Sequence, residues 1–444
     1  MAVAILVRLP FLHVPIDSDE GGYLYVARYW TSDYRLYRDI PFDRPPGIFL
    51  IYQAILGLLG DSVPAVRLGA AIWNAVTTLV LFRFAREITN SIWAATGAAL
   101  LFAVVSTNPY LEGFLAQAEL FAVLPLVLAA HLTWKGRWFG AGLLAGLATV
   151  IKPIGVSALL LAAGWLLWQR AGRRALGWLV LGYALVGFVA LGYVWTIDWP
   201  GFLATQQIKL ASLVGGPVQD GLMSTLWQTA PAWLGLTVLA LVGWHSSAKP
   251  VRVFGGLWII TSLIGMRMGH EWWPHYVVQI IPALAWLTAP AFANLKRQRI
   301  PVAVALTIIG CFFVASDLPL YVAEPKAVSW AVFHAPILVR QDEIAAYVEA
   351  TTRSTDTIQV MMSGPSLYVS AHRRAAVPHF YYYEYRRTPD AYQAVVAAVR
   401  AHVPAVVVLD SAPPPLYSAR DLLAVLTAAG YQRRRSFGSF VVYR

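Results

Sequence analysis

The chain has 444 residues, of which 58% are hydrophobic and only 13% are charged. Soluble globular proteins carry about 25% charged residues, so this composition excludes an ordinary soluble enzyme and predicts a membrane protein. The net charge of +11 does not indicate a nucleic-acid-binding protein, because lysine and arginine lie in short clusters between apolar runs. Backbone polar groups in lipid must be paired within their own segment, so the apolar runs are predicted to form helices of a mainly α fold.

About eleven apolar segments are predicted to cross the membrane, although some are shorter than the ~20 residues of a typical span. They lie at residues 1–14, 64–83, 91–107, 118–134, 138–151, 154–168, 175–197, 226–244, 253–268, 276–293 and 300–317. We interpret the first segment as a shortened span, which a start codon placed too late would explain, and not as a signal peptide. The single cysteine, Cys311, lies within an apolar segment, where it has no partner for a disulfide or a metal site, so disulfides and zinc are both excluded within one chain.

The loops between these segments differ in charge on the two sides of the membrane. If the N-terminus lies inside, the cytoplasmic loops contain one acidic residue, Glu87, whereas the opposite side carries many. The basic residues of the cytoplasmic loops are Arg83, Arg86, Lys135, Arg137, Arg170, Arg173, Arg174, Lys249, Arg252, Lys296, Arg297 and Arg299. Because basic loops face the cytoplasm, this pattern predicts the orientation of a multi-pass protein of the cytoplasmic (inner) membrane.

The composition changes after residue 318, where charged residues, proline and tyrosine become common and no further span-length apolar run occurs. We predict a transmembrane domain at 1–318, with a first external loop at 15–62, and a small α/β domain at 319–444. Periodicity predicts helices at 341–351, 391–401 and 421–429, and strands at 357–362, 405–409 and 439–443. The parity of the spans predicts that this C-terminal domain is extracytoplasmic.

Three carboxylates directly follow the first apolar segment, at Asp17, Asp19 and Glu20. Desolvating charge near a membrane is costly, so such a cluster either stays hydrated as a topology signal or has a function. The spacing of Tyr23 and the later aromatic residues of this loop predicts an amphipathic helix lying in the membrane interface. Arg44 lies on an Arg-Pro-Pro turn before an apolar helix at 48–59, where it suits either a lipid phosphate or an ordinary interfacial anchor.

The other external connections carry polar side chains of the same kinds. They are Glu112, Glu119, Lys152, Arg267, His270, His275 and Tyr276. Taken singly, each has an ordinary structural explanation, such as helix capping for Glu119 or snorkelling for Lys152. Together they offer carboxylates that can act as a base or metal ligand and cations that can hold a phosphate, on one face of the membrane.

Transfer of a sugar from a lipid-linked phosphate requires this combination of groups. The departing phosphate gains negative charge, the sugar gains oxocarbenium character, and the acceptor hydroxyl must lose a proton. Cations stabilise the phosphate, and a carboxylate accepts the proton.

Four motifs stand out, namely Asp19-Glu20-x-x-Tyr23, Arg44-Pro45-Pro46, Ala118-Glu119 and Pro274-His275-Tyr276-x-x-Gln279-x-x-Pro282. They resemble motifs of bacterial membrane glycosyltransferases of family 39. This family includes the protein O-mannosyltransferases and is similar to the lipid A aminoarabinose transferases, and the resemblance covers most of the chain. It implies a GT-C type fold and transfer of a sugar from a polyprenyl phosphate to an acceptor on the outer face of the membrane.

The resemblance also implies roles for individual residues. Asp19 matches the family's catalytic base and Glu20 its neighbour, while Arg44 matches a position that is often lysine and resembles a donor-phosphate contact. Arginine can hold phosphate through two hydrogen bonds, where lysine acts as a point charge. Asp17 adds a carboxylate and creates an Asp-x-Asp sequence suited to a divalent metal. The metal requirement stays open, because related transferases differ in it.

We therefore predict a glycosyltransferase that uses a polyprenyl-phosphate-linked hexose or pentose and a protein, lipid or glycan acceptor. We expect Asp19 to be the general base, with Glu20 and Glu119 positioning the base or the sugar. The candidates for binding the phosphate are Arg44, Lys152, Arg267 and His275. We expect these side chains to meet in one pocket that opens outward at the edge of the bilayer.

A transporter or flippase of lipid-linked glycans is the alternative interpretation. It predicts charged or broken helices near the membrane centre and internal repeats, and the sequence shows neither. A structural or binding subunit without catalysis is a third interpretation, and the presence of Asp19 disfavours it. In the C-terminal domain, the tyrosines and arginines of 381–387 are interpreted as a packed aromatic core with a basic edge, in preference to a glycan-binding surface.

Overall fold

The structure is a computed structural model of the chain. It describes residues 1–215, 221–268, 272–294, 317–361, 364–381, 390–411 and 419–444. Contacts within the chain divide it into two compact units. The first unit comprises residues 1–13, 44–193 and 217–324, and the second comprises 14–43, 194–216 and 325–444. The second unit thus takes residues 14–43 and 194–216, which the sequence-based division assigned to the transmembrane domain.

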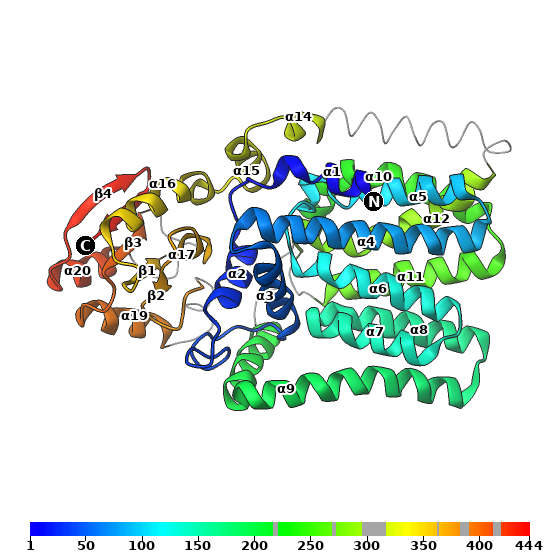
Figure 1. The fold of residues 1–444 in the computed structure, drawn as a ribbon, viewed down its shortest axis with the longest axis horizontal. Helices are drawn as coiled ribbons and strands as arrows, with labels where there is room; N and C mark the ends of the chain where they lie inside the picture. The colour runs from blue at the N-terminus through cyan, green and yellow to red at the C-terminus, as the bar shows by residue number, and fades with distance from the viewer. Residues whose placement is uncertain (216–220, 269–271, 295–316, 362–363, 382–389, 412–418) are drawn as a thin grey trace. The chain divides into compact units, whose positions relative to one another are not determined.

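The described part of the first unit is built from helices, many of which run side by side (Figure 1). The α-helices are α1 (Ala2–Leu6), α3 (Gly47–Leu59), α4 (Val63–Thr89), α5 (Ile92–Val105), α6 (Ala118–Trp134), α7 (Trp138–Ile151), α8 (Val156–Gln169), α10 (Leu222–His245), α11 (Lys249–Arg267), α12 (Ile281–Ala293) and α14 (Leu318–Tyr321). Short 3-10 helices connect some of them, namely η1 (Leu9–Phe11), η2 (Pro109–Leu111), η3 (Pro153–Gly155) and η4 (Pro274–Gln279). The prediction of a mainly α fold is confirmed.

Local sequence signals explain where the helices begin and end. The Ser62 side chain accepts a hydrogen bond from the Ala65 backbone N–H and starts α4, which ends at Asn90 in the left-handed conformation. Ser91 caps the next helix, α5, in the same way. The predicted apolar segments at 64–83 and 91–107 therefore correspond to two helices joined by a tight turn.

Close backbone approach and aromatic packing hold the bundle together. A Cβ atom at Gly243 of α10 would lie only 1.8 Å from the Leu287 carbonyl oxygen of α12, so glycine is required there. In lipid, where no hydrophobic force drives helices together, such small residues allow tight van der Waals packing. Aromatic rings fill the interior, as where Trp134 stacks on Trp165 with ring centroids 5.4 Å apart.

Three helical segments within the described residues are long and apolar enough to cross a membrane. They are Val63–Thr89, Gly172–Leu210 and Leu222–His245. Further apolar helices, such as α5 to α8 and α12, are 10–17 residues long. The number of about eleven spans stays a prediction, and the last predicted segment, 300–317, with Cys311, lies almost entirely outside the described residues.

The longest helix, α9 (Gly172–Gly215), is broken at Asp198, whose backbone is extended. The part before the break belongs mainly to the first unit and the part after it to the second. Only 17% of the most apolar stretch of this helix is buried. Its exposed side chains, including Phe188 and Trp195, are of the kind that face lipid.

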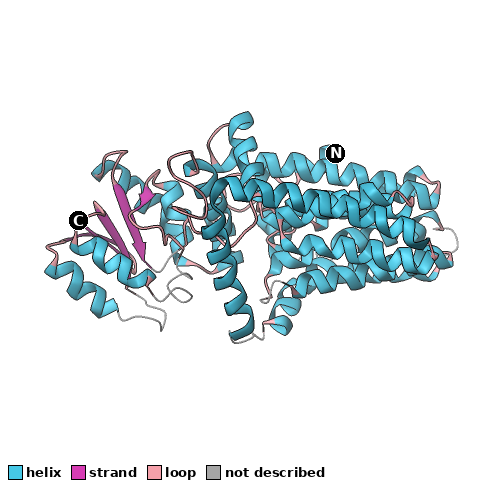
Figure 2. Ribbon diagram, turned by 90° about the horizontal axis from the view of Figure 1, so that it is seen from below, coloured by secondary structure: helices cyan, strands magenta, loops and turns pink. Residues whose placement is uncertain are grey.

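The second unit contains a five-stranded sheet (Figure 2). The strands are β1 (Thr357–Met361), β2 (Arg374–Ala375), β3 (Val406–Asp410), β4 (Arg433–Phe437) and β5 (Phe440–Tyr443), in the order β2-β1-β3-β5-β4. The first three pair in parallel, while β5 is antiparallel to β3 and β4. The predicted strand–helix–strand pattern is confirmed by β1, α19 (Ala391–Arg400) and β3.

Alternation along β3 explains the layers around this sheet. Val407 and Leu409 pack in a core with Val395 and Val399 of α19 and with Leu422 of α20 (Ala419–Ala428). The sequence did not predict β2, which has only two residues, or β4, whose Arg-Arg-Arg-Ser run is exposed and lacks an apolar alternation. Charged side chains of this kind protect the edge of a sheet from pairing with another chain.

The remaining helices of the second unit are α2 (Ser18–Tyr29), α15 (Pro325–Phe333), α16 (Pro336–Thr351) and α17 (Ser366–Ser370). The prediction that the aromatic residues after Asp19 form an amphipathic interfacial helix is wrong. Every residue of α2 from Glu20 to Ala27 is buried, so this helix has no lipid-facing or solvent-facing side over that stretch. Aromatic spacing alone does not distinguish an interfacial helix from one that packs among other aromatic side chains.

Candidate active site

Four of the predicted site residues form a connected ionic network in the first unit: Glu112, Glu119, Lys152 and His275. Lys152 Nζ makes an ion pair with Glu119 Oε1. The two ring nitrogens of His275 face the two carboxylates, with Nδ1 2.5 Å from Glu112 Oε2 and Nε2 3.6 Å from Glu119 Oε1. An imidazole that lies between two carboxylates is best satisfied when it is protonated, because Nδ1 can then donate to Glu112 while the positive charge of the ring balances Glu119.

The ends of helices and the turns beside them position this ionic network. Glu119 lies in the first turn of α6, where the helix dipole favours a negative charge. Lys152 is the extended C-cap residue of α7, immediately before η3. Glu112 ends η2 in a left-handed conformation with φ of 51°, and His275 lies within η4. Segments far apart in the sequence therefore bring opposite charges together.

Tyr276 adds an aromatic face to the ionic network. The Lys152 ammonium lies 4.7 Å from the centroid of the Tyr276 ring, which is a cation–π contact. Tyr276 is itself buried. The predicted pairing of a histidine and a tyrosine in η4 thus places two neighbouring side chains against the same lysine and carboxylates.

The ionic network is buried, so its positive and negative charges must balance. Glu119, Lys152 and His275 are 0%, 4% and 6% exposed, and a buried charge is tolerated only when it is paired. Burial by itself lowers the pKa of His275, but the carboxylates of Glu119 and Glu112 together outweigh burial. The pKa of His275 is consequently raised, which favours an imidazolium that balances the second carboxylate.

Gln279, from the same motif as His275, faces a small pocket in the interior of the bundle. Ser157, Thr261 and Ser262 also line this pocket. Both polar atoms of the Gln279 amide are buried and have no hydrogen-bond partner among the described residues. A Cβ at Gly265 would lie 3.0 Å from Gln279 Oε1, so the glycine leaves room for this side chain.

The acidic loop residues belong to the second unit and have different surroundings. Asp17 is the N-cap of α2, and its Oδ1 accepts a hydrogen bond of 2.8 Å from the Glu20 backbone N–H. Asp19 is half-buried, and its Oδ1 accepts a hydrogen bond of 2.6 Å from the Tyr381 hydroxyl. Glu20 is fully buried, as is Tyr23, whose ring packs near Phe42.

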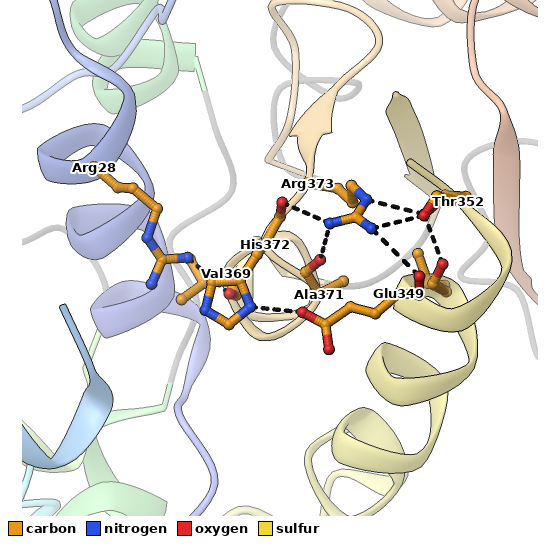
Figure 3. Close-up of polar contacts among 8 residues, drawn as sticks. Arg28, Glu349, Thr352, Val369, Ala371, His372 and Arg373 are labelled. Atoms are coloured by element: carbon orange, nitrogen blue, oxygen red, sulfur yellow. Dashed lines mark hydrogen bonds and ion pairs between the residues drawn. The ribbon is translucent and has the colours of Figure 1, made fainter. Parts of the chain in front are cut away.

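Hydrogen bonds anchor α2 to the C-terminal part of the second unit. Arg28 Nη1 donates to the Val369 carbonyl oxygen of α17 at 2.8 Å (Figure 3). The Tyr25 hydroxyl accepts from the Ala375 backbone N–H at 3.0 Å. The buried Arg373 guanidinium in turn ties the turn after α17 to Thr352 at the end of α16, through bonds to Thr352 Oγ1 and its carbonyl oxygen (Figure 3). The helix that carries Asp19 is therefore held by hydrogen bonds to the C-terminal part of the second unit.

Some predicted site residues belong neither to the ionic network nor to the acidic residues of α2. Arg44 is half-buried and lies just before Pro46, the N-cap of α3. Arg267 is exposed at the end of α11 and has no ion pair with the described residues of the ionic network. His270 lies outside the described residues. Within the described ranges, no three His, Cys, Asp or Glu side chains are grouped closely enough to hold a metal ion.

Tyr381 is the contact that sequence reasoning missed. It lies at the start of the tyrosine-rich stretch that was interpreted as packed aromatic core. Its ring does pack against Phe42 and Phe380 and is 3% exposed, but its hydroxyl also reaches Asp19. No sequence signal pairs two residues 362 positions apart. The other residues of this stretch, 382–387, lie outside the described part of the chain.

Comparisons with known proteins agree with this architecture. Residues 43–196 match the family profile of dolichyl-phosphate-mannose-protein mannosyltransferase. A comparison with curated protein sequences gives no match. The crystal structure of ArnT from Cupriavidus metallidurans bound to undecaprenyl phosphate is similar in fold, with a TM-score of 0.68 and 17% sequence identity. The apo structure of the same protein gives a TM-score of 0.67 and 16% identity, and both comparisons cover 100% of this chain and 96% of ArnT.

These findings confirm the predicted resemblance. The chain is similar to membrane glycosyltransferases of the GT-C superfamily, in sequence over residues 43–196 and in fold over its whole length.

Proposed function

We propose that the chain is a GT-C type glycosyltransferase, which moves a sugar from a polyprenyl-phosphate donor to an acceptor on the outer face of the cytoplasmic membrane. The observation that carries the proposal is the fold shared with ArnT over 100% of this chain, because one of those structures is bound to undecaprenyl phosphate. The acidic loop and the ionic network add the two kinds of chemical group that such a transfer requires.

Asp19 is the proposed general base. The acceptor hydroxyl attacks the anomeric carbon, the bond from that carbon to the phosphate oxygen breaks, and the phosphate leaves with the electron pair. The hydroxyl proton passes to the base, which must lie within hydrogen-bond reach of it. The half-buried position of Asp19 and the hydrogen bond from the neutral Tyr381 hydroxyl support this role, because a donor without charge occupies one oxygen and leaves further lone pairs of the carboxylate for a proton. Glu20 is its proposed positioning neighbour.

The proposed donor-phosphate contacts are cations of the first unit. Lys152 and His275 are held by Glu119 and Glu112, so we propose that they contribute positive potential from fixed positions. Arg44, and Arg267 at the exposed end of α11, are proposed to contact the phosphate directly. Glu119 would then act by keeping its cations in place, and Tyr276 by packing against Lys152.

The proposed arrangement in the membrane follows the charges of the loops. About eleven spans, an internal N-terminus and an extracytoplasmic segment after residue 318 would put the acidic loops outside and the basic loops inside. A cysteine introduced after Arg174, in a Cys311→Ala background, would then react with a membrane-impermeant maleimide only after the membrane is opened. Labelling of intact cells at that position would contradict the proposed orientation.

The decisive experiment follows transfer of radiolabelled sugar from undecaprenyl-phosphate-linked hexoses and pentoses into lipid, glycan and protein fractions of membranes containing the protein. We expect one donor to support transfer and Asp19→Asn to abolish it. Asp33→Asn is the matched control, because Asp33 is an exposed carboxylate of the same loop. Repeating the assay with a chelator decides whether the reaction requires a divalent metal.

Two results would contradict the proposal. If a folded Asp19→Asn variant turned over as fast as the unmodified protein, Asp19 would not be the base. If labelled donor crossed liposomes containing the purified protein without any new glycosidic bond, the transporter interpretation would replace the transferase.

A further inference from the structure

We propose that Tyr381 is a positioning residue for Asp19, so that the C-terminal part of the chain contributes directly to the catalytic apparatus. This inference rests on the proposed role of Asp19 as the base. Its starting point is the hydrogen bond of 2.6 Å from the Tyr381 hydroxyl to Asp19 Oδ1. This distance is in the range of a hydrogen bond between a hydroxyl and a charged carboxylate, which is stronger than one between neutral groups.

Two glycines of α2 leave room for the contact between Asp19 and Tyr381. A Cβ atom at Gly22 would lie 3.0 Å from Tyr381 Cε2 and from Phe42 Cε2. A Cβ at Gly21 would lie 2.7 Å from the Ser366 Cα of α17. The consecutive glycines after Glu20 therefore allow α2 to approach both α17 and the Tyr381 ring, at a cost in helix propensity.

The partner side chain is fixed as firmly as the helix. The Tyr381 ring packs edge-on against Phe42 with centroids 5.8 Å apart, and its neighbour Phe380 stacks on Tyr25 of α2 at 4.3 Å. Tyr381 has little rotational freedom, because it is 3% exposed. Its hydroxyl thus meets Asp19 from a position determined by the C-terminal part of the second unit.

The hydrogen bond from Tyr381 restricts rotation about the χ2 torsion of Asp19, which is broadly distributed in aspartate side chains. With Oδ1 held by Tyr381, the orientation of Oδ2 is also set, and Oδ2 retains lone pairs for the proton of an acceptor. A misplacement of about 1 Å in a catalytic group can cost as much as ~100-fold in rate. A lysine or arginine in this position would neutralise a charged carboxylate. The tyrosine hydroxyl carries no charge, so it orients the carboxylate without neutralising it.

The test is Tyr381→Phe, which keeps the ring packing and removes only the hydroxyl. We expect kcat for sugar transfer to fall by roughly ten- to a hundredfold while KM for the polyprenyl-phosphate donor is unchanged, since the hydroxyl acts on the base and not on the donor. Tyr368→Phe is the matched control. The Tyr368 hydroxyl is also buried in the second unit, where the hydrogen bond of 2.8 Å that it accepts comes from the Val360 backbone N–H and does not involve Asp19.

A comparable fall in kcat for both variants would assign the effect of Tyr381 to stability alone and overturn the inference. Unchanged kcat for Tyr381→Phe would overturn it as well. In an Asp19→Glu background, which retains a carboxylate but moves it by one methylene, the added cost of Tyr381→Phe should shrink, because residues that act together are not additive. An undiminished cost there would mean that Tyr381 acts independently of Asp19.

The same set of variants separates this inference from the proposed function. Full activity of Asp19→Asn would remove the base assignment itself. Loss of activity in Asp19→Asn with unchanged kcat in Tyr381→Phe would leave the proposed function intact and remove only the role of Tyr381.

Discussion

The two units each hold a carboxylate of the predicted site, and the partners of these carboxylates differ in kind. Glu119 is completely buried and faces the two cationic groups Lys152 and His275. Asp19 is half-buried and accepts a hydrogen bond from the neutral hydroxyl of Tyr381. A carboxylate committed to two cations holds its surroundings together, whereas one held by a neutral donor keeps charge and lone pairs for a proton.

The sequence presents these polar residues as one group, but the two carboxylates have different tasks. Glu119 has a structural task in the ionic network, and Asp19 is the proposed base. The ionic network of the first unit is closed, because each cation already has a carboxylate. Its first consequence is mechanical, since it ties η4 to the end of α7 and the start of α6. Its second is electrostatic, since it fixes cations in a dry environment where they act more strongly than in water.

The largest expected effect comes from opening the ionic network. Among the described side chains, Lys152→Met leaves the His275 nitrogen, 3.6 Å away, as the cationic partner of the buried Glu119. Removing one partner of a buried ion pair costs about 3–5 kcal/mol. We expect the free energy of unfolding to fall by this amount when unfolding in SDS is monitored by tryptophan fluorescence.

The control for this variant is the double replacement Glu119→Gln and Lys152→Met, which removes both charges. It should recover most of the lost stability, because no unpaired charge remains. Wild-type stability in the single variant would mean that the network does not hold the helix ends together.

The second prediction concerns the proton on His275. The carboxylates raise the pKa of His275 above its usual value, so the protonated ring stabilises the folded state. This contribution is complete below the unfolded pKa of about 6.5 and is lost as the pH rises through the raised folded pKa. We expect His275→Gln to cost about 1.5–3 kcal/mol at low pH, the usual value for a hydrogen bond to a charged group, and progressively less at alkaline pH.

The measurement is unfolding free energy as a function of pH for both proteins. His372→Gln serves as the control, because His372 lies 2.8 Å from Glu349 in a pair whose side chains are 56% and 43% exposed. Exposed pairs contribute only about 0–1 kcal/mol. A pH-independent difference between wild type and His275→Gln would show that the charge on this ring is unimportant.

The third prediction tests the frame that holds Asp19. Gly21→Ala places a Cβ 2.7 Å from the backbone of Ser366, and overpacking of this kind costs about 1–3 kcal/mol. Turnover should fall with stability, because α2 must move to relieve the contact. Gly57→Ala in α3 is the matched control, since no atom lies within 4 Å of its new Cβ and alanine gains up to about 1 kcal/mol of helix propensity. Equal effects of the two substitutions would contradict the close packing of α2.

Patterns local in the sequence predicted the parts of the molecule that depend on composition and periodicity. Apolar runs located helices such as α4 and α6, and short apolar runs located β1 and β3. Residue type also singled out the charged residues that form the ionic network, because charged groups near membrane helices are costly, but it did not predict which of these residues pair with one another. Roles in catalysis are not among the properties that these patterns determine.

The contacts that sequence patterns missed are long-range. The aromatic spacing after Asp19 is the same for a helix in a membrane interface and for α2, which is buried against aromatic side chains from the C-terminal part. The pairing of Asp19 with Tyr381 spans 362 positions and leaves no local signal. The glycine pair after Glu20 indicates that some other segment approaches α2 closely, but it does not identify that segment.

The smallest expected effect distinguishes a helix cap from a metal ligand at Asp17. Its Oδ1 accepts the Glu20 backbone N–H at 2.8 Å, and loss of an N-cap costs about 1 kcal/mol. We expect Asp17→Ala to lose this amount, and Asp17→Ser to lose little, because serine also caps helices. If Asp17 held a divalent metal, both substitutions would impair transfer equally and a chelator would reproduce the loss in the unmodified protein. Unfolding and sugar transfer, each measured with and without chelator, therefore decide between a residue that starts the helix of Asp19 and one that binds an ion beside it.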